Sequence, residues 1–269
     1  MKIIDAHIHC FSGDRAQDLA RRAGHENDMG HLSDEYARLG IVGAVVMGNR
    51  SLETDIHQYP DFLRYCIGLD RSSDFANNLN HTYENVEKNL QRSNCVGIKL
   101  YPGYNHQYVY DDIYTPVYEL AEHYGKPVAV HTGEAVFSAA RLKYCHPLTL
   151  DEVAVSFPRV QFVMCHLGNP WIVDAVAVLG KNPNVFADLS GLLEGSFDFP
   201  AFVREQEGYI DHIKTWLTYL NAYNKLMYGT DWPLANIQNY IDFVKLLIPE
   251  RHQEAVFADN ARHIYGLDL

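Results

Sequence analysis

The sequence predicts a single-domain α/β fold, a (β/α)₈ barrel of the TIM-barrel type. Eight short apolar segments alternate with segments of helical period along the 269 residues. This alternation is typical of parallel βαβ units, and eight such units suggest a closed barrel. After the first strand stands a His-x-His pair, where an open nucleotide-binding sheet normally has a glycine-rich turn. A barrel of this kind commonly occupies one domain of this length, so we expect residues 1–269 to form a single domain.

The composition is that of an ordinary globular protein, with 47% apolar and 21% charged residues. The net charge of −12 argues against a nucleic-acid or anionic-membrane partner and leaves a small molecule as the expected substrate. No apolar run approaches the roughly 20 residues of a membrane span, and no leader precedes the first strand, so we expect a cytoplasmic protein. The five cysteines are scattered without Cys-x-x-Cys spacing, which predicts reduced thiols.

The strands are expected where short apolar runs follow turn residues, at 3–10, 41–47, 65–69, 96–101, 127–131, 160–166, 185–189 and 226–230. Helices are expected at 33–40, 81–93, 113–124, 149–157, 171–180, 210–223, 237–247 and 253–264. Ser33 is the expected start of the first helix, and Gly40 and Gly125 are expected helix ends. Residues 10–31 show no clear period, and a loop of this length predicts a lid over an active site.

The first strand carries the two histidines that the rest of the site needs. Because side chains alternate along a strand, His7 and His9 are predicted to share one face, with Asp5 one layer below them. Ile4 and Ile8 are predicted to face the opposite side. Two imidazoles at this spacing can reach one metal ion.

Polar residues also end, or directly follow, four later strands: Lys99, His131, His166 and Asp231. The C-terminal mouth of a (β/α)₈ barrel brings such residues together. Imidazoles and a carboxylate suit zinc or a similar ion, which in catalytic sites keeps a position open for water. The ion lowers the pKa of that water from about 15.7 to about 7.

Each of these residues also has an ordinary interpretation when it is taken alone. A single histidine is more often a hydrogen-bonded core residue, and Asp231 before Trp-Pro resembles a turn residue. Their shared position at strand ends favours a metal site. Cys10 and Cys165 adjoin candidate ligands but have the opposite strand parity, so we expect both to face away.

Six motifs together resemble the amidohydrolase superfamily of metal-dependent barrel enzymes, and especially its amidohydrolase 2 branch of predicted hydrolases and aromatic-acid decarboxylases. They cover nearly the whole chain: Asp5-Ala6-His7-Ile8-His9, Gly97-Ile98-Lys99-Leu100-Tyr101-Pro102, Val130-His131-Thr132-Gly133, Cys165-His166-Leu167-Gly168, Asp188-Leu189-Ser190-Gly191 and Tyr228-Gly229-Thr230-Asp231-Trp232-Pro233.

The resemblance implies that His7, His9, His131 and Asp231 hold a catalytic divalent metal, with zinc as the expected ion. It implies that Asp231 also takes a proton from the metal-bound water and delivers it to the leaving group. His166 would then be a catalytic residue that hydrogen-bonds the substrate, or a ligand to a second ion.

The resemblance leaves two roles open for Lys99. A carboxylated Lys99 would bridge two metal ions, as in binuclear members, whereas an unmodified Lys99 beside one ion would pair with a substrate carboxylate. The decarboxylase branch generally lacks this lysine. Four aromatic residues that follow strand ends are candidates for substrate contact: Tyr101, Tyr104, Trp171 and Trp232.

We therefore expect a hydrolase that uses a metal-activated water on the C–N or C–O bond of a small amide, lactone or ester. The alternative is a non-oxidative decarboxylase of an aromatic or related acid. A TatD-like nuclease fits less well because of the lysine and the acidic charge, and a non-catalytic metal-binding barrel is a further alternative. The sequence leaves the substrate, the metal count and the oligomeric state open, with a homodimer as one candidate assembly.

Overall fold

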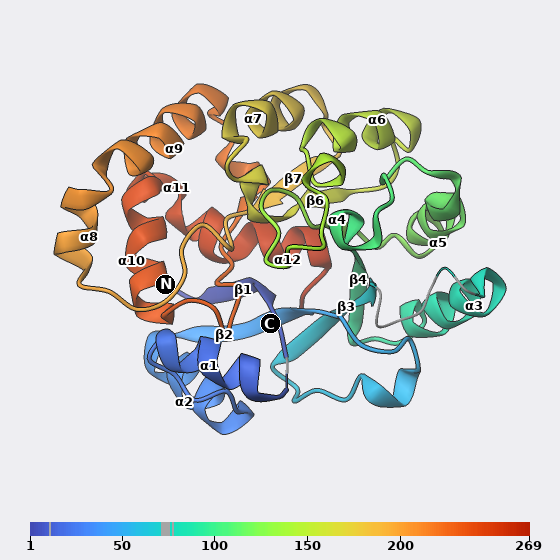
Figure 1. Cartoon of the computed structure of the whole chain (residues 1–269), viewed down its shortest axis with the longest axis horizontal. Coiled ribbons are helices and arrows are strands. Elements are labelled where there is room, and N and C mark those ends of the chain that lie inside the picture. The colour runs from blue at the N-terminus through green and yellow to red at the C-terminus, as the bar shows by residue number, and fades with distance from the viewer. Residues whose placement is uncertain (11, 71–75, 77) are drawn as a thin grey trace.

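The computed structural model describes residues 1–10, 12–70, 76 and 78–269, and eight parallel strands organise them (Figure 1). Each strand pairs with the next in chain order, from β1 to β8. The strands are β1 Ile3–Ile8, β2 Ile41–Met47, β3 Leu63–Leu69, β4 Cys95–Leu100, β5 Val128–Val130, β6 Phe162–Met164, β7 Val185–Asp188 and β8 Leu226–Met227. The predicted (β/α)₈ architecture is confirmed.

Helices connect the strands and cover the outside of the barrel (Figure 1). They are α1 Asp14–Arg22, α2 Met29–Leu39, α3 Leu79–Leu90, α4 Pro102–Asn105, α5 Thr115–Tyr124, α6 Leu148–Ser156, α7 Ile172–Lys181, α8 Phe199–Glu205, α9 Glu207–Leu220, α10 Ile237–Leu247, α11 Glu250–Glu254 and α12 Asn260–Tyr265. No helix of the described residues is long and apolar enough to cross a membrane.

Helix ends follow local side-chain chemistry. α2 begins at Met29 because the Asp28 side chain accepts a hydrogen bond from His31 N at 2.9 Å, so the predicted start at Ser33 is wrong. Gly40 ends α2 and Gly125 ends α5 in the left-handed conformation, as predicted. The sequence interpretation missed α8.

Alternate residues of the strands form two buried clusters. The cluster inside the barrel consists mainly of small and aliphatic side chains, including Val45, Cys66, Ala129 and Val163. Residues at the intervening positions pack outward against the helices. Residues of α12 join the inner cluster beside Ile4, so the last helix packs against the barrel interior.

β1 does not alternate as the sequence predicted. Its pairing with β2 is irregular between Asp5 and Ile8. As a result Ile4 belongs to the inner cluster and Ile8 to the outer one, while the Asp5 carboxylate accepts a hydrogen bond from Tyr36 of α2 at 3.0 Å. The prediction that Ile4 and Ile8 share a face, with Asp5 below the histidines, is therefore wrong.

The barrel closes between β1 and the segment that begins with β8. Three backbone hydrogen bonds of 2.8–2.9 Å cross this seam, from Ala6 N to Tyr228 O, from Asp231 N to His7 O and from His9 N to Trp232 O. The Asp5 carboxylate also accepts from Thr230 N at 2.9 Å and from Thr230 Oγ1 at 2.6 Å. These contacts place the end of β1 directly beside Asp231.

Residues 12–31, the predicted lid, contact segments that follow β5 and β8, and they contain α1 rather than a long loop. The Arg15 guanidinium lies 4.5 Å from the ring centroid of Phe137, which follows β5 on the far side of the barrel. At the other end of the segment, Asn236 Nδ2, after β8, donates to Ala23 O at 2.9 Å. The helix was missed because its apolar residues are only Ala16, Leu19 and Ala20, which give a weak helical period.

Candidate metal centre at the barrel mouth

Three ligand atoms converge where β1 ends and the chain leaves β8. Nε2 of His7 lies 3.6 Å from Asp231 Oδ1, and Nε2 of His9 lies 3.3 Å from the same oxygen. All three side chains are buried, and one ligand atom of each lies within 4.8 Å of the others. The two histidines of the first strand and the aspartate after the last strand therefore form one cluster.

The hydrogen bonds of both histidines leave Nε2 facing the cluster. His7 Nδ1 lies 2.9 Å from Asp188 Oδ2, and His9 Nδ1 lies 3.0 Å from Met47 O. A carboxylate and a carbonyl only accept, so each Nδ1 carries the hydrogen and each neutral ring has its lone pair on Nε2. Burial, aided by the charge of Lys99, lowers the pKa of His7 to about 3.

The cluster has the donor set of a divalent-metal site. His7 Nε2 and Asp231 Oδ1 are buried, and within the described residues neither has a hydrogen-bond partner. Buried acceptors that face one another without a donor are costly unless a cation lies between them. Two imidazole nitrogens and a carboxylate oxygen fit zinc or another first-row ion.

The backbone conformation of Asp231 is unusual, and a hydrogen bond holds it beside β1. Its φ of 57° is in the left-handed region, which non-glycine residues rarely adopt, and its N–H donates to His7 O at 2.9 Å. Burial raises the pKa of Asp231, but a hydrogen bond that His9 can donate in the absence of metal, and the charges of the surrounding imidazoles when they are protonated, outweigh burial and hold the pKa well below its usual range. Asp231 is therefore a carboxylate that can bind a cation.

His166 and His131 form a second pair beside this cluster. His166 Nε2 lies 3.1 Å from His131 Nδ1, and the other nitrogen of His131 donates to Glu134 O at 2.8 Å. His166 Nδ1 lies 3.9 Å from Asp231 Oδ2, and its ring centroid is 4.8 Å from that of His7. His131 thus contacts His166 and is not one of the three converging ligands, although the sequence predicts it as a fourth.

Lys99 is fully buried within the barrel, with Nζ 2.7 Å from Cys165 Sγ. The expectation that Cys165 faces away is wrong, because its thiol also lies within 4.8 Å of ligand atoms of His7 and Asp188. The strand alternation fails here because β6 ends at Met164, and a 3₁₀ turn begins at Cys165. Lys99 is thus an internal residue of the site.

Two of the four aromatic candidates lie next to the histidines. The Tyr104 ring centroid is 5.0 Å from that of His131, and the Tyr101 centroid is 6.5 Å from it. The Tyr101 hydroxyl is used structurally, since it donates to Gly48 O at 2.9 Å. Tyr104 is therefore the aromatic residue best placed to contact a substrate.

The two tryptophans differ in their surroundings. Trp232 is buried, with its ring 4.8 Å from His25 of the lid segment. The ring centroid of Trp171 lies 4.9 Å from that of His146. The described ring contacts do not join Trp171 to the site histidines, and Trp232 links the lid to the Asp231 segment.

The sequence interpretation gave no role to Asp188 and Ser190, which lie in the site. Asp188 ends β7 and accepts hydrogen bonds from His7 Nδ1 and from His166 N, the latter at 3.0 Å. Ser190 Oγ lies 2.9 Å from His166 Nδ1. The available signal was a carboxylate at the end of an apolar strand, within one of the six motifs.

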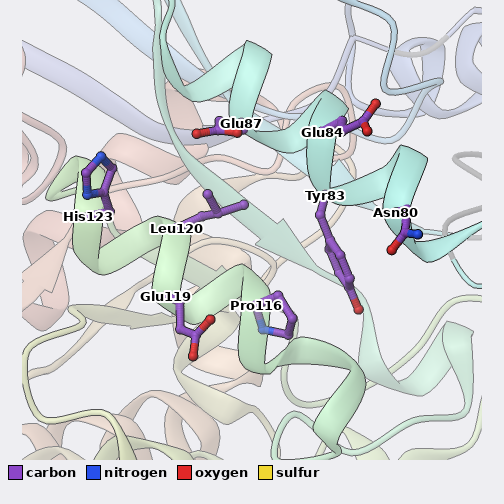
Figure 2. Close-up of a pocket in the computed structure, with 8 residues that line it drawn as sticks. All are labelled: Asn80, Tyr83, Glu84, Glu87, Pro116, Glu119, Leu120 and His123. Carbon is purple, nitrogen blue, oxygen red and sulfur yellow. The ribbon is translucent and has the colours of Figure 1, made fainter.

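A surface groove lies away from this site, between α3 and α5 (Figure 2). Tyr83, Pro116 and Leu120 form its apolar part, and glutamates of both helices border it. It contains none of the strand-end residues, so it is separate from the candidate centre.

An eight-stranded barrel that gathers histidines from its first strand and an aspartate after its last strand defines a class, the metal-dependent TIM-barrel enzymes. The chain belongs to the amidohydrolase family, whose model (Amidohydro_2) matches residues 4–267. Hydrolysis and decarboxylation both fit this family and its structural neighbours. No curated protein matches the chain.

Solved structures share the fold. An uncharacterised TIM-barrel protein from Bordetella bronchiseptica is 20% identical, with 99% of each chain covered and a TM-score of 0.70. A putative 2-pyrone-4,6-dicarboxylic acid hydrolase from Pseudomonas putida is 20% identical, covering 100% of this chain and 98% of its own, with a TM-score of 0.64. A dihydroxybenzoic acid decarboxylase from Polaromonas sp. JS666, with bound manganese and 2-nitroresorcinol, is 14% identical. The match covers 100% of this chain and 98% of the decarboxylase chain, with a TM-score of 0.67.

Proposed function

We propose that the protein is a metal-dependent hydrolase of a small carbonyl compound, an amide, lactone or ester. His7, His9 and Asp231 would hold the divalent ion, with His131 as the proposed fourth ligand and zinc as the first candidate ion. When bound, such an ion supplies an activated water and polarises the substrate carbonyl. The observation that carries this proposal is the convergence of three ligand atoms, of which His7 Nε2 and Asp231 Oδ1 have no hydrogen-bond partner among the described residues.

The chain's own residues would move the protons. Asp231 has a second carboxylate oxygen, Oδ2, directed toward His166 Nδ1 at 3.9 Å. This oxygen is positioned to take a proton from the attacking water and return it to the leaving group. His166 would hydrogen-bond the substrate, and Tyr104 would contact its body.

Metal content and turnover test the proposal together. Protein purified without chelator is expected to carry at least one ion per chain, two if Lys99 is carboxylated, and His9→Ala is expected to carry less. Asp231→Asn is expected to keep a hydrogen-bonding oxygen but lose turnover of any amide, lactone or ester found in a screen. Full turnover by metal-loaded Asp231→Asn would overturn the mechanism.

The second candidate is a decarboxylase, and the aromatic surface of Tyr104 beside His131 favours it because an aromatic acid could stack there. Carbon dioxide release from an aromatic carboxylic acid would decide for it. The metal count also separates the candidates. Two ions and a native-mass gain of one carboxyl group in bicarbonate would assign Lys99 as a bridging carbamate and favour hydrolysis, whereas one ion without that gain would favour the decarboxylase.

We propose a small molecule as the only substrate class. The imidazoles of His9, His131 and His166 are each at most 8% exposed beneath the lid, too enclosed to receive a nucleic-acid duplex. A homodimer is the proposed assembly, and light scattering on the purified protein would measure it.

A further inference from the structure

An amine and a thiol meet inside the barrel at an unusually short distance. Lys99 Nζ lies 2.7 Å from Cys165 Sγ, and both residues are fully buried. For the smaller oxygen acceptor, N–H···O hydrogen bonds span about 2.7–3.2 Å between the heavy atoms. Because sulfur is larger than oxygen, an ordinary N–H···S contact is longer than this. The two groups are therefore closer than a hydrogen bond between them requires.

The strand register of the barrel brings the pair together. Lys99 of β4 pairs with Ala129 of β5, and Ala129 pairs with Val163 of β6. Ala129 belongs to the inner cluster, and its methyl group is short enough for the lysine side chain to extend past it. Cys165 is fixed on the other side, because its carbonyl oxygen accepts a hydrogen bond from Thr132 Oγ1 at 2.5 Å. The contact thus depends on the sheet and not on an exposed loop.

The surroundings of Lys99 Nζ offer a charged amine little compensation. Within the part of the chain that the structure describes, Cys165 Sγ is the one hydrogen-bond acceptor of Nζ, and Lys99 forms no ion pair. The charge of Lys99 acts on Asp188 from beyond ion-pair distance, and the Tyr101 ring centroid lies 5.3 Å from Nζ. A thiol sulfur is a weak acceptor, and a buried charge with one weak partner is costly. A covalent bond that removed the charge would relieve this cost.

We propose that Lys99 and Cys165 form a redox modification site, in which dioxygen joins Nζ and Sγ through one bridging oxygen atom. After the ammonium releases its proton, the amine, the thiol and O₂ give Cys–S–O–NH–Lys and one water. The S–H bond and one N–H bond break, and an S–O bond and an N–O bond form. Sulfur and nitrogen each lose two electrons. These four electrons reduce dioxygen, of which one atom enters the bridge and the other leaves as water.

The reaction is expected to be slow and to be directed by proximity. Burial, together with the charge of Asp188, raises the pKa of the Cys165 thiol well above its ordinary value, so the sulfur is not a free thiolate at neutral pH. Fixed neighbours react without the entropy cost of meeting, which favours the bridge over attack by outside reagents. A bridged Lys99 could neither carry a carbamate nor pair with a substrate carboxylate. The bridge would therefore switch off both roles that are open for this lysine, and it does not depend on which of them is correct.

The test is mass spectrometry of the full-length denatured protein, purified in air and also without oxygen. Protein purified in air is expected to gain the mass of one oxygen atom less two hydrogen atoms, and protein kept from oxygen is expected to lack this gain. Exposure to ¹⁸O₂ should place the heavy isotope in the bridge. After proteolysis the peptides that carry Lys99 and Cys165 should be linked, and dithiothreitol, which supplies the electrons and protons for the reverse reaction, should separate them.

Variants assign the bridge to this pair. Cys165→Ser and Lys99→Arg are expected to lose the mass gain, whereas Cys66→Ser should keep it, since Cys66 is another fully buried thiol of the inner cluster. The linked peptides of the wild type test the assignment even if a variant does not fold. No gain after exposure to air, a gain that persists in Cys165→Ser, or whole oxygen atoms added to Cys165 alone would overturn the proposal. A loss of two hydrogens without added oxygen would also overturn it, because that change indicates a direct S–N bond.

Discussion

The seam that closes the barrel depends on one carboxylate, and Asp5→Ala is the change that tests it. Asp5 accepts hydrogen bonds from Thr230 N, Thr230 Oγ1, Tyr36 OH and His7 N, and it is fully buried. Alanine would leave four buried donors unsatisfied. At about 1 kcal/mol for each lost bond, the free energy of unfolding should fall by about 4 kcal/mol. For a chain of this size that corresponds to a Tm lower by roughly 10 °C.

Chelator-treated protein is the right sample for this measurement, because metal binding would add its own stabilisation. Urea denaturation of the wild type and Asp5→Ala gives the difference directly. Tyr36→Phe is the matched control, since it removes only one of the four bonds and should cost about 1 kcal/mol. A loss below about 1 kcal/mol for Asp5→Ala would refute the idea that this carboxylate holds the seam.

Three further predictions concern the centre, the lid and the sheet. Removal of the metal by a chelator should lower Tm, and zinc at about 100 times its Kd should restore about 2.7 kcal/mol in the wild type but less in His9→Ala, as calorimetry would show. His25 is buried and its pKa is lowered to about 4, below its ordinary value, so the unfolded chain takes up a proton first as the pH falls. Stability should therefore decrease between about pH 6.5 and pH 4, on the order of 1 kcal/mol from this residue, and His25→Phe should flatten that slope in urea titrations. Gly68→Ala should destabilise by more than about 3 kcal/mol, because its Cβ would lie 1.6 Å from Gly48 O, whereas Gly208→Ala, with nothing within 4 Å, should be neutral or slightly stabilising by thermal melting.

The barrel was predictable because its strands and helices each have a characteristic short-range spacing of apolar residues. The strand at 41–47 matches β2, and the other expected strands lie within a few residues of those found. Once the strands are placed, barrel geometry alone brings His131, His166 and Asp231 to one mouth. The convergence of His7 and His9 on Asp231 was therefore accessible without coordinates.

What the sequence did not reveal depends on local irregularity. Alternation assigned Asp5 and Cys165 to the wrong sides because β1 is irregular and β6 ends before Cys165. The partners of Lys99 and the roles of Asp188 and Ser190 depend on contacts between strands far apart in the chain. Periodicity within one strand carries no information about such contacts.

Residues 12–31 have a consequence for the rate at which a ligand binds to this site. Because Arg15 of α1 contacts Phe137 beyond β5 and Trp232 packs against His25, we predict that residues 12–31 restrict the access of a substrate to the imidazoles. Entry then requires an opening step, and the measured association rate becomes the intrinsic rate multiplied by the open fraction. At high ligand concentration the binding rate should reach a plateau equal to the opening rate. The opening of residues 12–31 would thus limit the rate of substrate binding, whichever bond is broken in the site.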